Sequence, residues 1–126
     1  MFTFNLEGFN RNSFYLAKLM CQYNPLFVFI QEHWLPHHTA TSKFKLNFET
    51  HNFLTTSADM FTHAEDLMLE PGTVWHGSAI GWSNEIDKLV TKLPVISDRF
   101  CGIEYKDNQT VMLAYSVYLP TSGKDD

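Results

Sequence analysis

The segment Phe27–Leu35, which reads F-V-F-I-Q-E-H-W-L, constrains the fold more than any other part of the sequence. Aromatic and β-branched residues fill its first four positions, and an apolar run this short predicts a buried strand. The run stops at Gln31, and the carboxylate of Glu32 follows directly. In α/β proteins, ligands and metals bind where strands end. The segment therefore predicts an α/β fold with Glu32 at the rim of a sheet.

The residues before this segment predict a strand and a helix. Residues 2–6 alternate apolar and polar side chains, which is typical of a strand, and Gly8 ends that strand. Apolar residues then recur at helical spacing and form one face: Leu16, Leu19, Met20 and Tyr23. The pair Asn24–Pro25 stops the helix. The chain thus begins as a strand–helix–strand unit.

The middle of the chain is less regular. Residues 35–42 contain Pro36 and predict a loop, and residues 44–48 fit either a strand or a short helix. Residues 51–56 predict a strand. Residues 57–71 lose any apolar period and predict a long loop, a kind of segment that is uncommon unless it has a function.

The last third of the chain predicts mainly strands. Residues 72–82 have strand character. The apolar spacing of residues 84–93 also fits a helix, but the family resemblance described below implies a strand, and we favour a strand on that ground. Residues 99–105 and 110–118 are rich in β-forming residues. The polar sequence K-D-N-Q at 106–109 separates them, so this pair predicts a hairpin.

Composition limits the class of protein. A chain of 126 residues predicts one domain, and 44% hydrophobic residues are enough for a core. The sequence has no apolar run of membrane-spanning length and does not open with a signal-peptide pattern, so we expect an intracellular protein without a membrane segment. Cys21 and Cys101 are too few for a disulfide scaffold, and we expect buried free thiols.

The net charge of −5 argues against tight binding of nucleic acid, because phosphate contacts come from Lys and Arg. Part of the acidity lies away from any predicted strand end, in Glu65, Asp66 and Glu70 of the long loop and in Asp125 and Asp126. A metal site also requires acidic residues. The charge therefore leaves room for phosphodiester chemistry.

Three motifs together resemble one known family. They are F-N-L-E-G at Phe4–Gly8, I-Q-E-H-W at Ile30–Trp34 and S-V-Y-L-P at Ser116–Pro120. In this order they resemble the endonuclease/exonuclease/phosphatase superfamily, whose members share a fold with DNase I and exonuclease III. The block W-H-G-S-A-I-G-W and the tail S-V-Y-L-P-T-S-G-K-D-D are similar to the endonuclease domains of non-LTR retrotransposons. The resemblance covers essentially the whole chain.

The resemblance implies a four-layer α/β sandwich, in which two packed mixed β-sheets are flanked by helices. Residues 1–126 would form the N-terminal part of such a domain, because the family's later G-D-F-N-like and S-D-H-like strands do not occur in the sequence. We therefore expect a partial, truncated domain that exposes a sheet face.

The metal site implied by the resemblance centres on Glu32. Hydrolysis of a phosphodiester needs a cation to neutralise charge, and Mg²⁺ uses one or two protein carboxylates plus water, with Mn²⁺ as an alternative ion. Glu32 matches the family's metal ligand, and Glu7 stands where the family often has Asp or Asn near the metal. Gln31 is expected to be a supporting group. The alternative for Glu32 is a solvated loop acid.

Asn5 and Tyr118 are the expected catalytic and phosphate-binding residues. The resemblance implies that the Asn5 amide holds a phosphate oxygen or orients the metal carboxylate, and that the Tyr118 hydroxyl stabilises charge on the phosphate. The alternatives are an ordinary turn asparagine and a cross-strand aromatic. The family's catalytic His–Asp pair, which activates water, would lie outside this chain.

The histidines offer a competing metal site. His33 and His37 are spaced as on one helical face, but Pro36 lies between them in a predicted loop and no second ligand motif accompanies them, which disfavours zinc. His51 and His76 are predicted to be packed or surface residues.

The sequence therefore predicts a metal-dependent phosphodiester hydrolase domain, a DNA-nicking endonuclease of retroelement type, present as an incomplete fragment. The resemblance implies DNA or another phosphodiester as substrate, a reverse transcriptase domain in a longer parent protein and a nuclear location. Two alternatives remain open. One is a phosphatase or sphingomyelinase-like member of the same superfamily, and the other is a non-catalytic remnant or binding fragment.

Overall fold

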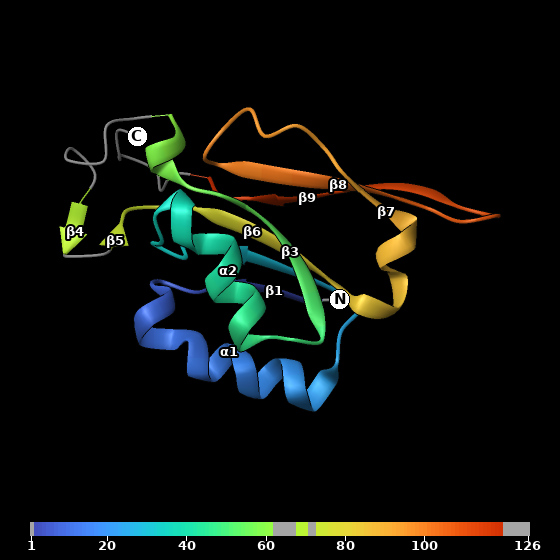
Figure 1. Ribbon diagram of the computed structural model, residues 1–126, viewed down its shortest axis with the longest axis horizontal. Coiled ribbons are helices and arrows are strands. Elements are labelled where there is room, and N and C mark those ends of the chain that lie inside the picture. Colours follow the sequence, from blue (N-terminus) through green and yellow to red (C-terminus); the bar gives the residue numbers. More distant parts are fainter. Residues whose placement is uncertain (1, 62–67, 71–72, 120–126) are drawn as a thin grey trace.

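The computed structural model describes residues 2–61, 68–70 and 73–119. These residues form three layers: two helices, a four-stranded sheet and a three-stranded sheet, with the four-stranded sheet in the middle (Figure 1). The expected α/β sandwich of two packed sheets is confirmed, but the described residues form three of the four expected layers, because both α-helices lie on the same side of the middle sheet. None of the described helices is long and apolar enough to span a membrane.

The middle sheet has the strand order β1-β2-β6-β3. Its strands are β1 (Phe2–Asn5), β2 (Phe27–Gln31), β6 (Ser78–Ser83) and β3 (His51–Thr56). β1 runs parallel to β2, and β6 runs antiparallel to both β2 and β3. Therefore β1, β2 and β3 end at the same edge of the sheet, and β6 begins there.

Helix α1 (Phe9–Tyr23) connects β1 to β2, as predicted for a strand–helix–strand unit. It ends at Asn24, whose left-handed backbone (φ 42°) forms the C-cap. Leu16 and Met20 are buried in the core, as expected, but Tyr23 is 63% exposed. The prediction for Tyr23 is wrong because it is the last residue of the helix and lies beyond the buried cluster that holds Leu16 and Met20.

Helix α2 (His37–Asn47) replaces the loop that was predicted for residues 35–42. Pro36 does not interrupt the helix, because it occupies the N-cap, where its fixed φ is compatible and no backbone N–H is needed. The helical alternative for residues 44–48 is correct as far as Asn47. Ala40 and Phe44 are the buried residues of this helix.

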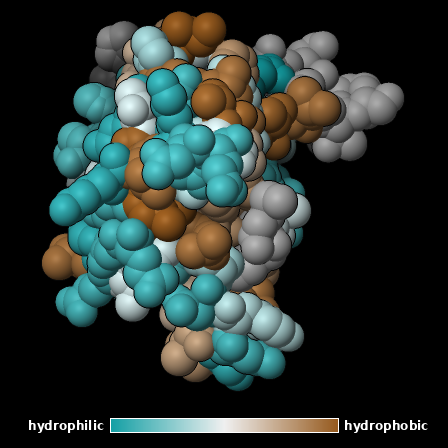
Figure 2. All heavy atoms as spheres, turned by 90° about the vertical axis from the view of Figure 1, so that its right-hand side faces the viewer, coloured by the Kyte–Doolittle hydropathy of each residue, from teal (hydrophilic) through white to brown (hydrophobic). Residues whose placement is uncertain are grey.

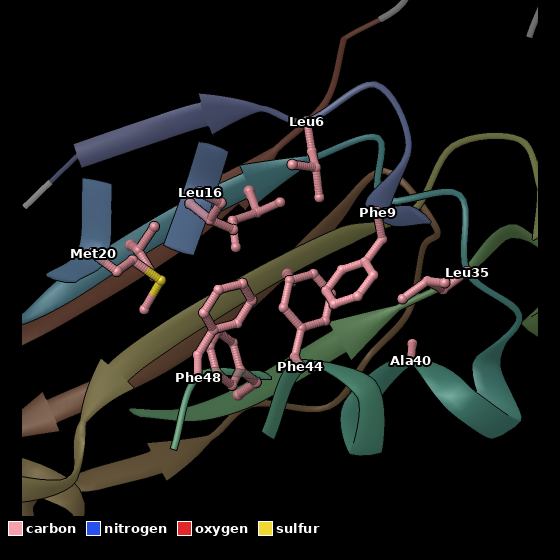
Figure 3. Packing of buried hydrophobic residues seen from close by; sticks show 12 residues of the cluster. Leu6, Phe9, Leu16, Met20, Leu35, Ala40, Phe44 and Phe48 are labelled. Atoms are coloured by element: carbon pink, nitrogen blue, oxygen red, sulfur yellow. The ribbon is translucent and has the colours of Figure 1, made fainter. Parts of the chain in front are cut away.

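Aromatic rings fill the space between the helices and the middle sheet (Figure 3). The Phe44 ring of α2 lies at the centre of this cluster. Its centroid is 4.9 Å from that of Phe9, 5.0 Å from that of Phe53 and 6.0 Å from that of Phe48. These contacts join α1, α2 and β3 in one core.

The second sheet contains β7 (Val90–Lys92), β8 (Phe100–Lys106) and β9 (Val111–Val117). The predicted hairpin is confirmed by the antiparallel pairing of β8 with β9. Residues 84–93 combine both expected structures, since a 3₁₀ helix, η2 (Asn84–Leu89), precedes β7.

The inner face of the second sheet packs on the middle sheet. Cys101 and Ile103 from β8 are buried against Ile80 and Trp82 from β6. Cys101 is thus a core thiol, as predicted. Cys21 is exposed on α1, so its predicted burial is wrong, because the residue faces away from the buried side that its neighbour Met20 occupies.

The predicted long loop at 57–71 contains regular structure where it is described. A short 3₁₀ helix, η1 (Ala58–Met60), follows β3, and β4 (Met68–Glu70) pairs with β5 (Thr73–Val74). Two acidic residues assigned to this loop, Glu65 and Asp66, lie outside the described residues.

Substitution of Phe44 tests the central core. Phe44→Ala should lower the free energy of unfolding by about 3–5 kcal/mol, because it leaves a cavity among three phenylalanine rings. Leu46→Ala, on the same helix at a position 75% exposed, should change it by no more than about 0.5 kcal/mol. Urea unfolding followed by circular dichroism measures both. Equal losses in the two variants would contradict this description of the core.

Candidate functional site

The loops at the end of the middle sheet meet in one place, which we call the strand-end edge. It comprises residues 5–8, 32–34 and 76–78, and lies at the left of Figure 1. Three backbone hydrogen bonds join these loops: Gly8 N–H donates to the Glu32 carbonyl oxygen (2.9 Å), His33 N–H to that of Gly77 (3.2 Å), and Trp34 N–H to that of His76 (2.9 Å).

Strained backbone is concentrated at this edge. Five residues other than glycine have a positive φ in the described parts of the chain, and four of them lie here: Glu7, Glu32, Trp34 and His76. The left-handed region costs roughly 1–2 kcal/mol per residue with a Cβ. Such strain persists where surrounding structure enforces it, and it clusters at functional sites.

The opposite end of the sheets, which faces the viewer in Figure 2, has hydrophilic side chains over much of its surface.

The predicted metal and phosphate residues of the first two strands are brought together here. Asn5 is the register partner of Gln31, so Glu32 follows directly beyond this pair. Glu7 lies between two residues whose amides bond to the end of β2 and the residue after it. Leu6 N–H donates to the Gln31 carbonyl oxygen (2.8 Å), and Gly8 N–H donates to the Glu32 carbonyl oxygen. The side chain of Glu32 is half-buried, and those of Asn5 and Glu7 are exposed.

Gln31 connects the two sheets at this edge. Its Nε2 donates to Ser116 Oγ of β9 and to Thr3 Oγ1 of β1, both at 3.2 Å. Ser116 Oγ in turn donates to the carbonyl oxygen of Ile30 (2.9 Å). The Gln31 side chain is therefore held by hydrogen bonds to both sheets, as expected for a supporting group. The same bonds hold the end of β9 against the end of β2.

Tyr118 follows β9 and reaches the same edge. Its N–H donates to the Arg99 carbonyl oxygen (2.7 Å), which also accepts a hydrogen bond from Ser78 Oγ (3.4 Å). The Tyr118 ring lies 5.4 Å from the ring of His76, centroid to centroid. The structure thus brings Tyr118 beside the loop that borders the Glu32 segment.

The donors at this edge suit a hard, oxygen-binding cation. Glu32 supplies a half-buried carboxylate, and Asn5 and Glu7 add amide and carboxylate oxygens on the adjacent loop. Within residues 2–61, 68–70 and 73–119, no group of three or more His, Cys, Asp or Glu side chains is arranged to hold a metal. Mg²⁺ needs only one or two protein carboxylates because water completes its shell. Glu32, with Glu7 on the adjacent loop, is the carboxylate set that such an ion would find at this edge.

His33 is fully buried beneath Glu32. Leu35 N–H donates to His33 Nδ1 (2.9 Å), so the neutral ring carries its hydrogen on Nε2, which donates to the Thr56 carbonyl oxygen (2.9 Å). Burial lowers the pKa of His33 to about 4. His37, its proposed partner in the zinc hypothesis, is exposed at the start of α2.

An aromatic and cationic cluster beside the edge was not found from the sequence. The Arg11 guanidinium lies 5.5 Å from the ring centroid of Trp34, and the Trp75 ring packs edge-on against Trp34 at 5.4 Å. Gly8 allows this packing, since a Cβ there would lie 2.7 Å from Trp34 Cε3. Arginine and exposed aromatic rings bind phosphates and bases. The three residues are far apart in sequence, which is why no local pattern revealed them.

The layers and the strand-end edge define an α/β sandwich with a candidate site at the ends of its strands. A solved structure with a similar fold is an AP endonuclease, LMAP from Leishmania major, with a TM-score of 0.68 and 16% sequence identity. The match covers 98% of this chain and 41% of that one. At this identity the likeness shows the fold alone, and it supports the expected endonuclease/exonuclease/phosphatase-like fold. No family model and no curated protein matches the sequence.

The burial of His33 makes stability depend on pH. Its pKa is about 4 in the folded chain and about 6.5 when unfolded, so the unfolded chain binds the proton first as the pH falls. The contribution of neutral His33 to the free energy of unfolding should be fully present above about pH 6.5. It should decline by about 3 kcal/mol as the pH falls to about 4. Denaturant unfolding at several pH values measures this.

The matched comparison is His33→Gln, which has no titrating ring. The difference in unfolding free energy between wild type and this variant should shrink as the pH falls from 7 to 4.5. A difference that stays constant across this range would contradict a neutral, buried His33.

Proposed function

We propose that this chain carries the metal-ligand part of a phosphodiester hydrolase that nicks DNA, with Glu32 as the ligand of Mg²⁺. The observation that carries the proposal is the strand-end edge itself. There the Glu32 loop, the Asn5–Gly8 loop and Tyr118, from three strands and both sheets, are joined by hydrogen bonds around strained backbone.

Each side chain has a role that its chemistry allows. Glu32 holds the ion, with Glu7 as a second carboxylate beside it. When bound, Mg²⁺ neutralises charge on the phosphate and on the leaving oxygen. The amide of Asn5 and the hydroxyl of Tyr118 donate hydrogen bonds to phosphate oxygens, which stabilises the charge that develops as the phosphodiester reacts.

DNA is the substrate that the surroundings favour. Arg11 and Trp75 lie next to the strand-end edge, which itself carries net negative charge. The Arg11 cation suits a phosphate, and Trp75, which is 42% exposed, suits stacking with a base. The similar fold of an AP endonuclease points the same way. The retroelement type, a reverse transcriptase partner domain and a nuclear location rest on two segments, W-H-G-S-A-I-G-W and S-V-Y-L-P-T-S-G-K-D-D, which resemble non-LTR retrotransposon endonucleases.

We further propose that groups outside this chain complete the active site. The G-D-F-N-like and S-D-H-like motifs do not occur in the sequence, and the match spans 41% of the AP endonuclease chain. An open groove between β1, β2 and β9 also supports this. Its lining includes Phe29, Met112 and Tyr115, which are apolar side chains of the kind that a further layer covers.

The proposed metal site is tested with Mn²⁺ as a paramagnetic probe for Mg²⁺. Wild type should bind Mn²⁺, and Glu32→Gln, which keeps the shape of the side chain and removes its charge, should weaken binding by about tenfold or more. The matched control is Glu49→Gln, an exposed acid in the turn between α2 and β3, which should bind as wild type does. Electron paramagnetic resonance of free Mn²⁺ gives the affinities. Equal affinity of wild type and Glu32→Gln would refute the metal site.

The chain alone should not nick DNA, because it lacks the group that activates water. Supercoiled plasmid incubated with the purified chain and Mg²⁺ should remain as intact as in the EDTA control. Nicking that disappears both with EDTA and in Glu32→Ala would show that this chain completes its own site, and would overturn the proposal of missing groups. If the chain binds Mn²⁺ through no carboxylate at this edge, a non-catalytic remnant is the better description.

A further inference from the structure

His33 occupies an unusual place in the backbone of the strand-end edge. Its two neighbours, Glu32 and Trp34, both have left-handed backbones, with φ of 59° and 60°. Left-handed residues on both sides of one position are costly for side chains with a Cβ. The chain therefore needs a strong local constraint to hold this conformation, and His33 is the residue between them.

Four segments of the chain are hydrogen-bonded to His33. The ring bonds to Thr56 at the end of β3 and to Leu35 after β2, as described above. Its backbone carbonyl accepts from Phe9 N–H at the start of α1 (2.8 Å), and its N–H donates to Gly77 before β6 (3.2 Å). These bonds link the start of α1 and the ends of β2 and β3 to the start of β6.

The His33 ring is packed closely by its neighbours. A Cβ on Gly77 would lie 2.4 Å from His33 Cε1, so the backbone of Gly77 lies directly against the imidazole. On another side the Phe44 ring packs edge-on, with centroids 5.7 Å apart. Because the ring is fully buried, water cannot replace either of its two hydrogen bonds.

We propose that His33 is a positioning residue for the metal site: it fixes the left-handed backbone of Glu32, and through it the carboxylate that binds the cation. This inference rests on the proposed function for the role of Glu32. The contacts themselves extend from the His33 ring through one peptide bond to Glu32, whose carbonyl oxygen is held by Gly8 N–H. A metal ligand held in this way loses affinity when its support is removed.

The chain contains a matched control at the opposite end of the same sheet. His51, at the start of β3, is also fully buried. Its Nε2 bonds to the Pro25 carbonyl oxygen (2.7 Å) and its Nδ1 to Thr50 Oγ1 (2.9 Å). His51 therefore matches His33 in burial and in having both ring nitrogens bonded, but its bonds do not reach the strand-end edge.

The experiment compares His33→Leu, His33→Gln and His51→Leu in the full 126-residue chain. Two readouts are measured: affinity for Mn²⁺, and hydrogen exchange of individual amides by NMR. The informative amides are those of Gly8, bonded to Glu32, and of Asn84, bonded to Thr50 at the opposite edge (2.9 Å).

We expect a reciprocal pattern. His33→Leu should raise the exchange rate of the Gly8 amide by about tenfold or more relative to Asn84, through local opening, and weaken Mn²⁺ binding by about tenfold. His51→Leu should instead raise the exchange rate of the Asn84 amide relative to that of Gly8, and it should leave the Mn²⁺ affinity unchanged. His33→Gln should fall between wild type and His33→Leu, because its amide can still donate to the Thr56 carbonyl.

Two results would overturn the inference. One is a folded His33→Leu chain with Gly8 exchange and Mn²⁺ affinity like those of His51→Leu. The other is an equal loss of Mn²⁺ affinity in both variants, which would show a general effect of stability. If His33→Leu does not fold, His33→Gln and His51→Gln are compared by the same criteria.

The two readouts also separate this inference from the proposed function. If wild type binds no Mn²⁺, the metal site is wrong, while the Gly8 amide still decides whether His33 holds the Glu32 backbone. If wild type binds Mn²⁺ through Glu32 and His33→Leu binds it equally well, the metal site stands and the positioning role fails.

Discussion

The parallel pairing of β1 with β2 is the constraint on which the rest of the structure depends. Parallel neighbours need a crossover, and α1 supplies it, so the first element of the core is determined by this pairing. The register then places Asn5 opposite Gln31, so that two loops begin side by side at the same edge. A shift of one residue would turn every side chain of β1 to the other face. The candidate site therefore exists because the core face of β1 can be buried in only one register.

The contribution of the second sheet depends on a few polar contacts between layers. Ser116, on the otherwise apolar inner face of β9, donates to the carbonyl of Ile30 and accepts from Gln31. Buried polar groups need partners, so these bonds are satisfied only when β9 lies in one place along β2. That position carries Tyr118 to the strand-end edge. Apolar packing between Ile103 and Ile80 holds the layers together, whereas Ser116 determines how they are aligned.

The sequence predicted those parts of the fold that have a local cause. The strand before Glu32, helix α1 and the hairpin of β8 and β9 were all expected, because periodicity and turn residues determine them. The first half of helix α2 was missed because Pro36 was interpreted as part of a loop, although a proline at a helix start is favourable.

The site was predicted unevenly for a related reason. Glu32, Asn5 and Tyr118 were predicted from motifs, and the structure brings their segments to one edge, while their roles at the site stay predictions. The contacts of the His33 ring and the Arg11–Trp34–Trp75 cluster were not found, because they join residues that are distant in sequence. His33 was considered as a zinc ligand and disfavoured, and the sequence gives no sign that its ring reaches Thr56.

The strain at the strand-end edge also explains why a histidine suits position 33 better than an apolar residue. Four left-handed residues cost several kcal/mol together, at roughly 1–2 kcal/mol each, and the core must offset this. An apolar side chain would fill the same space but leave the Thr56 carbonyl and the Leu35 amide unpaired, which adds a further penalty. A neutral imidazole bonds to both and remains uncharged in its buried position. In the role that we propose for His33, the polar group in the core stabilises the strained backbone of Glu32, and the carboxylate on that backbone is the ligand of the proposed Mg²⁺ site.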